Sequence, residues 1–175
     1  MHDMIFRGNL EDFLESKNLD IMKFIRFGII DENELCNIFE ITMPTVSFSN
    51  PVDIVRVDND SRNQTFYILK FSIAGNTDVL DYKPSTSFIT MPEWVIRNGE
   101  IWFQIEEQDL ETMKTHIDGL IETFKSHLID ISTDIHIYNT TLRTNIQKLT
   151  NAYNNKISSK NKNMDEIRNH LLFRD

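Results

Sequence analysis

A long, proline-free repeat of apolar residues restricts the possible folds more than any other feature of this chain. From Leu110 to Ile157 apolar residues recur at a mean spacing of about 3.6 residues, which is the period of an α-helix. The stretch contains no proline, and its only glycine is Gly119. Asp109 precedes it as a predicted N-cap, and Glu111 lies in the first turn, where an acid favours a helix. The repeat predicts a long amphipathic helix.

One segment inside this repeat, IDISTDIHIYN at residues 129–139, has two interpretations. Its apolar and polar residues alternate, which is typical of a half-buried β-strand. That strand would place on one face Ile129, Ile131, Thr133, Ile135 and Ile137. The β-branched side chains in this set also favour a strand.

The helical interpretation of the same segment depends on its flanks. Phe124 and Leu142 are separated by about five helical turns, so the apolar stripe resumes in the same phase beyond the segment. Neither Gly nor Pro marks a boundary there. We therefore favour the helix, which predicts that Ile131, Ile135 and Tyr138 are buried together. Ile129 and Ile137 then fall outside the stripe.

A helix over residues 109–157 would be about 73 Å long, more than a compact globule of this size can cover. Its apolar stripe needs a partner helix, which could be a second copy, another protein or its own far half folded back. Bends are predicted at Ser132-Thr133 or Asn139–Thr141. The predicted interface consists of Leu128, Ile131, Ile135, Tyr138, Leu142, Ile146 and Leu149. After Ile157 the letters SSKNKN predict a turn, and Asn163 is expected to start a separate short helix.

Residues 9–41 predict three short helices, the second of which is the apolar segment NLDIMKFIRFGII at residues 18–30. Asn9 and Asp31 are candidate N-caps, and Gly28 is a candidate stop between them. The inward positions of the helix after Asp31 are expected to be Leu35, Ile38 and Phe39.

Residues 43–107 predict β-structure, because the four prolines and several β-branched runs lie there. The clearest signal is Asn98-Gly99, a preferred two-residue hairpin turn, which joins Trp94–Arg97 to Glu100–Ile105. Two further strands flank a turn at Asp58–Asn63. These strands could form a small sandwich, a curved sheet or a partial barrel.

The predicted fold class is therefore α+β. Short N-terminal helices precede a mainly antiparallel β-region with an Asn-Gly hairpin, and a long C-terminal amphipathic helix, bent or straight, is followed by a short helix. The predicted domains are a head at residues 1–108 and a helical arm at 109–175.

Charge and composition exclude several functional classes. The formal net charge is −9, and it is concentrated before residue 110, so a nucleic-acid partner is disfavoured. No apolar run reaches the roughly 20 residues needed to span a bilayer, and no signal peptide is recognised. Cys36 is the only cysteine. These features predict a cytoplasmic protein without a membrane partner.

Potential metal ligands lie along the long repeat but do not form a known motif. His127 and Asp130 are three residues apart, so they could approach one ion on a helix, whereas Asp134 and His136 could not join them. HExxH and paired ExxH motifs are absent from the sequence. We therefore predict no metal, no cofactor and no catalytic residue, and interpret these side chains as polar groups beside a buried seam.

The function predicted from these patterns is a non-enzymatic protein-protein interaction or oligomerisation module, which binds itself or another protein through the helical arm. The chain could be a subunit or fragment of a larger assembly. The alternative is a ligand-sensing domain with a pocket in the β-region around Trp94, Trp102 and Tyr82, signalling through the helix. A hydrolase using His127 is a third, less favoured hypothesis.

Overall fold

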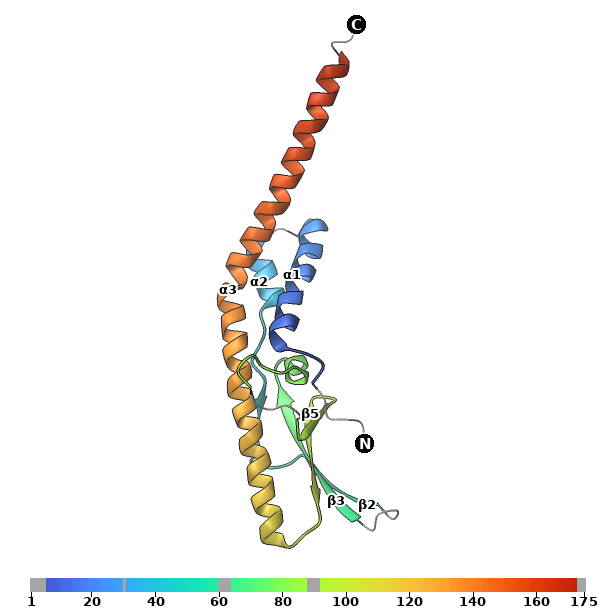
Figure 1. The fold of residues 1–175 in the computed structure, drawn as a ribbon, viewed down its shortest axis with the longest axis vertical. Helices are drawn as coiled ribbons and strands as arrows, with labels where there is room; N and C mark the ends of the chain where they lie inside the picture. Colours follow the sequence, from blue (N-terminus) through green and yellow to red (C-terminus); the bar gives the residue numbers. More distant parts are fainter. Residues whose placement is uncertain (1–5, 30, 60–63, 88–91, 173–175) are drawn as a thin grey trace. The chain divides into compact units, whose positions relative to one another are not determined.

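The computed structural model describes residues 6–29, 31–59, 64–87 and 92–172 (Figure 1). The chain forms two compact units, each of which combines two segments that are separated in the sequence. The first consists of Met1–Phe13 and Ile41–Ile137, and the second of Leu14–Glu40 and Tyr138–Asp175. The predicted head and arm are divisions along the sequence, whereas these units are divisions in space.

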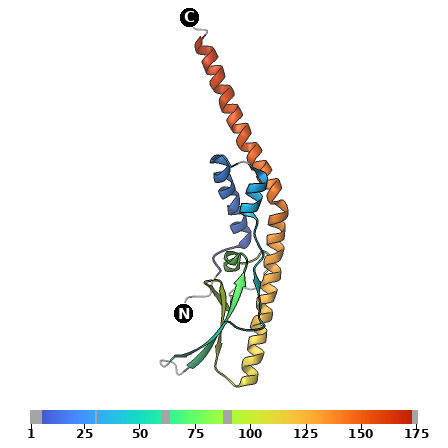
Figure 2. The same cartoon turned by 180° about the vertical axis from the view of Figure 1, so that it is seen from behind.

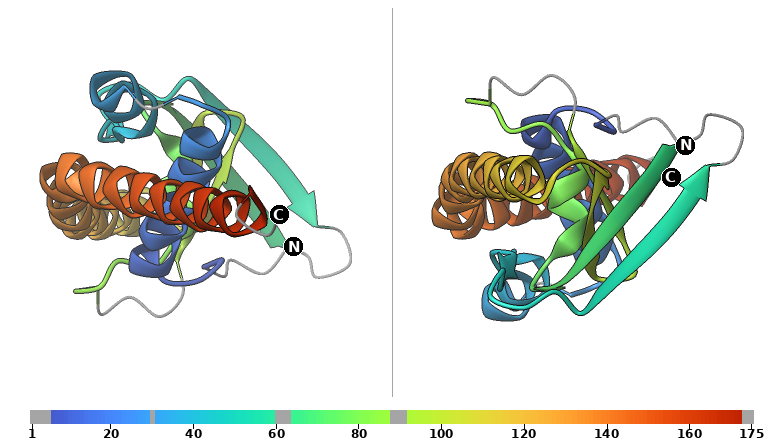
Figure 3. Two further views of the ribbon diagram at one scale, coloured as in Figure 1. Left: turned by 90° about the horizontal axis from the view of Figure 1, so that it is seen from above. Right: turned by 90° about the horizontal axis from the view of Figure 1, so that it is seen from below.

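The first unit contains an antiparallel half-barrel sheet, so the partial barrel is the predicted form that matches. Its strands are β1 (Thr45–Val46), β2 (Asp53–Asn59), β3 (Gln64–Ala74), β4 (Trp94–Arg97) and β5 (Glu100–Glu106). The order is β1-β3-β5-β4, and β2 also pairs with β3. β1 and β2 use different parts of the long strand β3, and β2 and β3 run side by side (Figure 3).

The Asn-Gly hairpin between β4 and β5 is confirmed. Asn98 and Gly99 have φ angles of 52° and 76°, the two positive values that this tight turn requires. The turn sets the register in which Trp94 pairs with Phe103. Both side chains therefore lie on the inner face of the sheet.

The core of the first unit lies between this inner face and helix α3 (Leu110–Leu172), whose first part is yellow in Figure 2. The ring of Phe124 on α3 is 5.0 Å from that of Trp94 and 6.1 Å from that of Phe103. Burial of these large rings supplies much of the apolar area removed from water. Other buried members are Leu69, Phe71, Ile101, Ile105, Leu120 and Ile131.

Between β3 and β4 the chain forms a short 3₁₀ helix, η1 (Thr77–Asp81). The middle of the predicted turn at Asp58–Asn63 lies outside the described residues, as does part of the loop before β4.

The second unit is a helical assembly of α1 (Leu10–Arg26) from Leu14 onward, α2 (Glu32–Phe39) and α3 from Tyr138 onward. The hydroxyl of Tyr138 donates a buried hydrogen bond of 3.1 Å to the carbonyl oxygen of Phe39. Burial raises the pKa of Tyr138 to about 12, so this hydroxyl keeps its proton. Apolar packing is provided by Leu14, Ile21, Ile25, Leu35, Phe39, Leu142 and Ile146.

The ends of the N-terminal helices follow the predicted chemistry. Asp31 caps α2 by accepting a 2.8 Å hydrogen bond from the backbone N–H of Glu34. Gly28 ends α1 with φ of 93°, and the bonds from Gly28 N to Ile25 O and from Ile29 N to Phe24 O form a Schellman motif.

Two details of the N-terminal prediction were wrong. α1 is one helix of 17 residues instead of two short segments, because neither Gly nor Pro interrupts it. Ile38 is 45% exposed, whereas Leu35 and Phe39 are buried as predicted. The exposed position of Ile38 shows that the buried face of α2 is narrower than its apolar pattern.

Helix α3 confirms the helical interpretation of residues 129–139. Ile131, Ile135 and Tyr138 are buried, whereas Ile129 and Ile137 are 67% and 58% exposed. Asp109 caps the helix by accepting a 3.0 Å hydrogen bond from Thr112 N. The phase of the stripe, rather than the local alternation, therefore decides the structure.

The predicted turn after Ile157 and the separate short helix after it were wrong, because α3 continues without a break to Leu172. Ser and Asn are weak helix formers, but they lack the steric and hydrogen-bonding defects of Gly and Pro. The predicted bend points also remain helical. There, Ser132 and Thr133 donate side-chain hydrogen bonds to the carbonyl of Ile129, which satisfies their hydroxyls within the helix.

Candidate binding groove on helix α3

An open groove of about 460 Å³ lies between α1 and α3 in the second unit. α1 contributes two residues that are one turn apart, and α3 contributes five that follow the helical repeat. The lining residues are Met22, Arg26, Ala152, Tyr153, Lys156, Ile157 and Lys160. The groove is therefore lined both by apolar side chains and by the cations Arg26, Lys156 and Lys160.

The groove lies where the apolar stripe of α3 loses its cover. Ile146 is fully buried, Tyr153 is half-buried, and Ile157 is 39% exposed. The stripe then continues in phase to Met164 and Ile167, which are more than half exposed. From residue 154 to residue 170 every side chain is exposed, and we call residues 154–170 the distal segment of α3.

The cations around the groove have no ion-pair partner in the part of the chain that the structure describes. Arg26, Lys156 and Lys160 form no ion pair with another described residue. In contrast, Lys23 in the same turn as Arg26 pairs with Asp20 at 2.7 Å. In addition, the sequence between Asp134 and Asp165 contains five basic residues and no acidic one. The groove is consequently a site of uncompensated positive charge.

Most of the predicted helical interface is covered within the chain itself. Leu128 and Leu149 are half-buried, and the fully buried members are Ile131, Ile135, Tyr138, Leu142 and Ile146. Towards the C-terminal end of α3, a partner can therefore reach the stripe without unfolding the chain from Leu149 onward. The one sign of this region that is visible in the sequence is the basic cluster Lys156, Lys160 and Lys162.

The sequence predicts that His127 lies beside the buried stripe of α3, but its side chain is itself buried in the core. Its ring is fully buried, 4.9 Å from the ring of Trp94 and 5.4 Å from that of Phe6. Neither ring nitrogen forms a hydrogen bond of normal geometry with a described group, although the backbone of Leu80 is near. Burial lowers the pKa of His127 to about 4, against a small opposing effect from Leu80. The imidazole is therefore neutral at pH 7 and out of reach of a substrate.

The neighbouring acids act as hydrogen-bond acceptors between α3 and the loop after η1. Asp134 accepts from both the N–H and the hydroxyl of Ser85, the first at 2.9 Å, and Asp130 accepts from the hydroxyl of Thr86 at 3.1 Å. Among the described residues no three His, Cys, Asp or Glu side chains gather closely enough to hold a metal ion.

The three aromatic residues of the alternative ligand pocket do not line one cavity. Trp94 is buried on the inner face of the sheet, whereas Trp102 lies on the outer face, with the Lys70 ammonium 4.9 Å from its ring. Tyr82 stacks on Phe13 at 4.4 Å. Each ring thus has a separate packing role.

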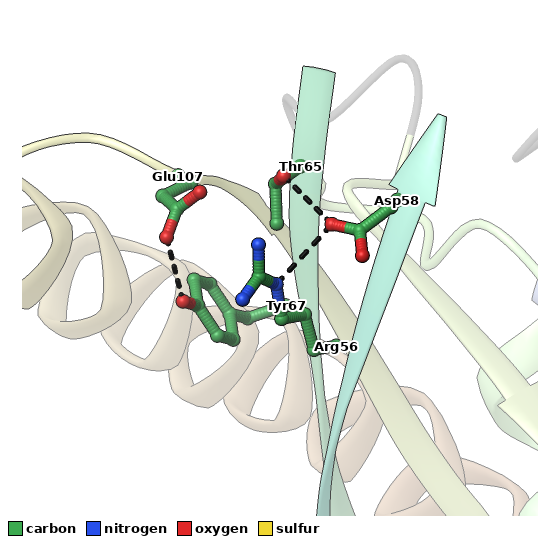
Figure 4. A network of polar contacts seen from close by, with 5 residues as sticks. All are labelled: Arg56, Asp58, Thr65, Tyr67 and Glu107. Carbon is green, nitrogen blue, oxygen red and sulfur yellow. Dashed lines mark hydrogen bonds and ion pairs between the residues drawn. The ribbon is translucent and has the colours of Figure 1, made fainter. Parts of the chain in front are cut away.

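A polar network on the β2–β3 ribbon is the other cluster that could carry chemistry (Figure 4). Tyr67 donates a 2.8 Å hydrogen bond to Glu107, and Asp58 accepts from Arg56 and Thr65. The hydrogen bond to Glu107 raises the pKa of Tyr67, which disfavours the tyrosinate that a base or nucleophile would need. The network therefore orders the ribbon and the start of the α3 connection, and offers no free catalytic group.

Comparison with protein-family models, curated proteins and solved structures found no match for this chain. None of the described helices has a stretch long and apolar enough to cross a membrane. We therefore infer the function from the chain's own residues.

Proposed function

We propose that this protein is a non-enzymatic interaction module that docks onto another polypeptide through the distal segment of α3 and the groove at its base. The observation that carries the proposal is the exposure of the helical stripe beyond Tyr153. The same face that is buried upstream presents Ile157, Met164 and Ile167 to solvent.

The stability of the distal segment supports this proposal. It is rich in Asn and Ser, which are weak helix formers, and isolated helices of such length and composition are marginal in water. Every described side chain of the segment is also exposed, and the rest of the described chain approaches it only at the groove. A partner that buries the stripe would supply the missing tertiary stabilisation.

The chemistry of the remaining candidate residues supports a role without catalysis. His127 is enclosed by aromatic rings, and Tyr67 is held protonated by Glu107. Among the described residues, the ring nitrogens of His127 have no base or nucleophile beside them, and the raised pKa of Tyr67 disfavours the tyrosinate although its hydroxyl lies 2.8 Å from Glu107. The proposed activity is therefore binding.

Position-specific photo-crosslinking tests this function in the cells that produce the protein. A photoreactive residue at position 157 or 164 is expected to give a discrete cross-linked product, because these positions lie on the exposed stripe. Positions 129 and 137 are matched controls, since Ile129 and Ile137 are more exposed than Ile157 and Met164 and lie on the same helix but off the stripe. Equal products at all four positions, or no product at 157 and 164, would contradict the proposal.

A further inference from the structure

Building on the proposed docking role, we infer that the groove binds an acidic, amphipathic helical segment of a partner protein. Two features of the groove support this partner. Its apolar lining residues are Met22, Tyr153 and Ile157. Its cations, Arg26, Lys156 and Lys160, form no ion pair with a described carboxylate.

The shape of the groove matches a helix-in-groove mode of recognition. It lies between two helices, and its volume of about 460 Å³ is sufficient for several side chains. In this mode a partner helix places apolar anchors at i, i+3 or i+4, and i+7 into the groove. Beyond the groove, Met164 and Ile167 continue the apolar track for the same ligand.

The charge pattern defines the flanks of that ligand. Arg26 stands on the α1 side, and Lys156 and Lys160 stand on the α3 side. Acidic residues beside the anchors would therefore meet positive charge on both sides of the groove. Partly enclosed pairs of this kind contribute more than fully exposed ones, because the apolar lining excludes some of the screening water.

A second copy of α3 is a poorer occupant than an acidic helix. The distal segment carries four basic residues and two acidic ones, so two copies would set net positive charge against net positive charge. Lys160 also lies on the stripe, so parallel self-pairing would set Lys160 against its own counterpart. Like charges in that position oppose association.

The test uses the full chain and a fluorescent synthetic helix of about 16 residues, long enough to form helix on binding. Its leucines recur alternately every three and every four residues, so they share one face of the helix. Glutamates occupy the positions on either side of that face. Fluorescence anisotropy should show saturable binding that weakens with salt. A second peptide, with every glutamate replaced by glutamine, should bind about tenfold more weakly, equivalent to about 1.4 kcal/mol.

Matched protein variants locate the binding site. The double substitution Lys156→Gln and Lys160→Gln should weaken binding of the glutamate peptide about tenfold. Lys148→Gln with Lys162→Gln removes the same charge from the same helix outside the groove, and should change affinity less than about threefold. Ile157→Asn should also weaken binding, and circular dichroism should show that all variants keep the parent helix content.

Several outcomes would overturn the inference: absence of saturable binding, equal affinity of the two peptides, or equal losses in the two lysine double variants. Self-association would have a separate signature. If sedimentation shows a dimer that Ile157→Asn disrupts and that the peptide cannot displace, the occupant is a second copy. In that case the acidic-helix inference fails while the docking role of α3 stands.

Discussion

The carboxylate of Asp134 on α3 accepts two hydrogen bonds from Ser85, one from its backbone N–H and one from its hydroxyl. The two residues are 49 positions apart in the sequence. Asp134 is 7% exposed, so these bonds replace most of the water that would otherwise solvate its charge. They fix the loop after η1 against the helix that forms the core of the first unit.

Replacement of Asp134 by Ala should lower the free energy of unfolding by about 2 to 3 kcal/mol, because it leaves the Ser85 donors unsatisfied. The matched variant Asp130→Ala loses one hydrogen bond, at a more exposed position, and should cost less than about 1 kcal/mol. Urea denaturation followed by circular dichroism measures both. Equal losses would show that the two hydrogen bonds from Ser85 contribute no more to the free energy of unfolding than the single bond from Thr86.

His127 should make stability depend on pH. Folding lowers the pKa of His127 from 6.5 to about 4. Between these two pH values, His127 is therefore protonated in the unfolded chain and neutral in the folded chain. Stability should therefore fall as pH decreases from about 6.5 to about 4, by a total of about 3 kcal/mol from this group. His127→Phe should flatten this part of the profile, measured by urea denaturation at several pH values. An unchanged slope in the variant would refute the assignment.

Gly75 should tolerate no side chain. Its φ is 91°, and an added Cβ would lie 2.5 Å from the carbonyl oxygen of Met43. Gly75→Ala should destabilise the fold by about 2 to 3 kcal/mol through strain and steric overlap. Gly28 has a similar φ of 93° but no atom near its Cβ position, so Gly28→Ala should cost only about 1 kcal/mol. Thermal unfolding separates the two, and similar losses would argue against the Met43 contact.

Gly119 should respond in the opposite direction. It lies inside α3, is exposed, and has open space around its Cβ position. Gly119→Ala should therefore stabilise the protein by about 0.5 to 1 kcal/mol, because alanine is the better helix former. A higher midpoint of thermal unfolding is the expected result, and a lower one would mean that this turn of α3 has an unrecognised contact.

The main elements of the fold could be predicted from sequence where a long-range pattern and a local signal agreed. Asn98-Gly99 combined a specific turn chemistry with apolar runs on both sides. At residues 129–139 the local alternation was misleading, but Phe124 and Leu142 carried the helical phase across it. The turn chemistry was therefore decisive at the hairpin, and the period of the apolar pattern was decisive at residues 129–139.

The errors had a common physical cause, since weak helix propensity was given too much weight after Ile157. Only Gly or Pro would have supplied a strong reason to end the helix there. Burial of His127 could not be predicted either, because it depends on Phe6 and Trp94, which are distant in sequence. The groove likewise requires α1 and α3 together, although its charge was visible in the basic cluster Lys156, Lys160 and Lys162.

The distal segment should depend on a partner for its stability, and hydrogen exchange followed by mass spectrometry measures this dependence. In the isolated chain at low concentration, amides of residues 154–170 should exchange far faster than those of residues 120–146, which belong to the covered part of α3. Addition of the acidic helical peptide should slow exchange in residues 154–170 and leave residues 120–146 unchanged. Equal, strong protection of both segments in the isolated monomer would contradict the account, because the distal helix would then be stable without a partner.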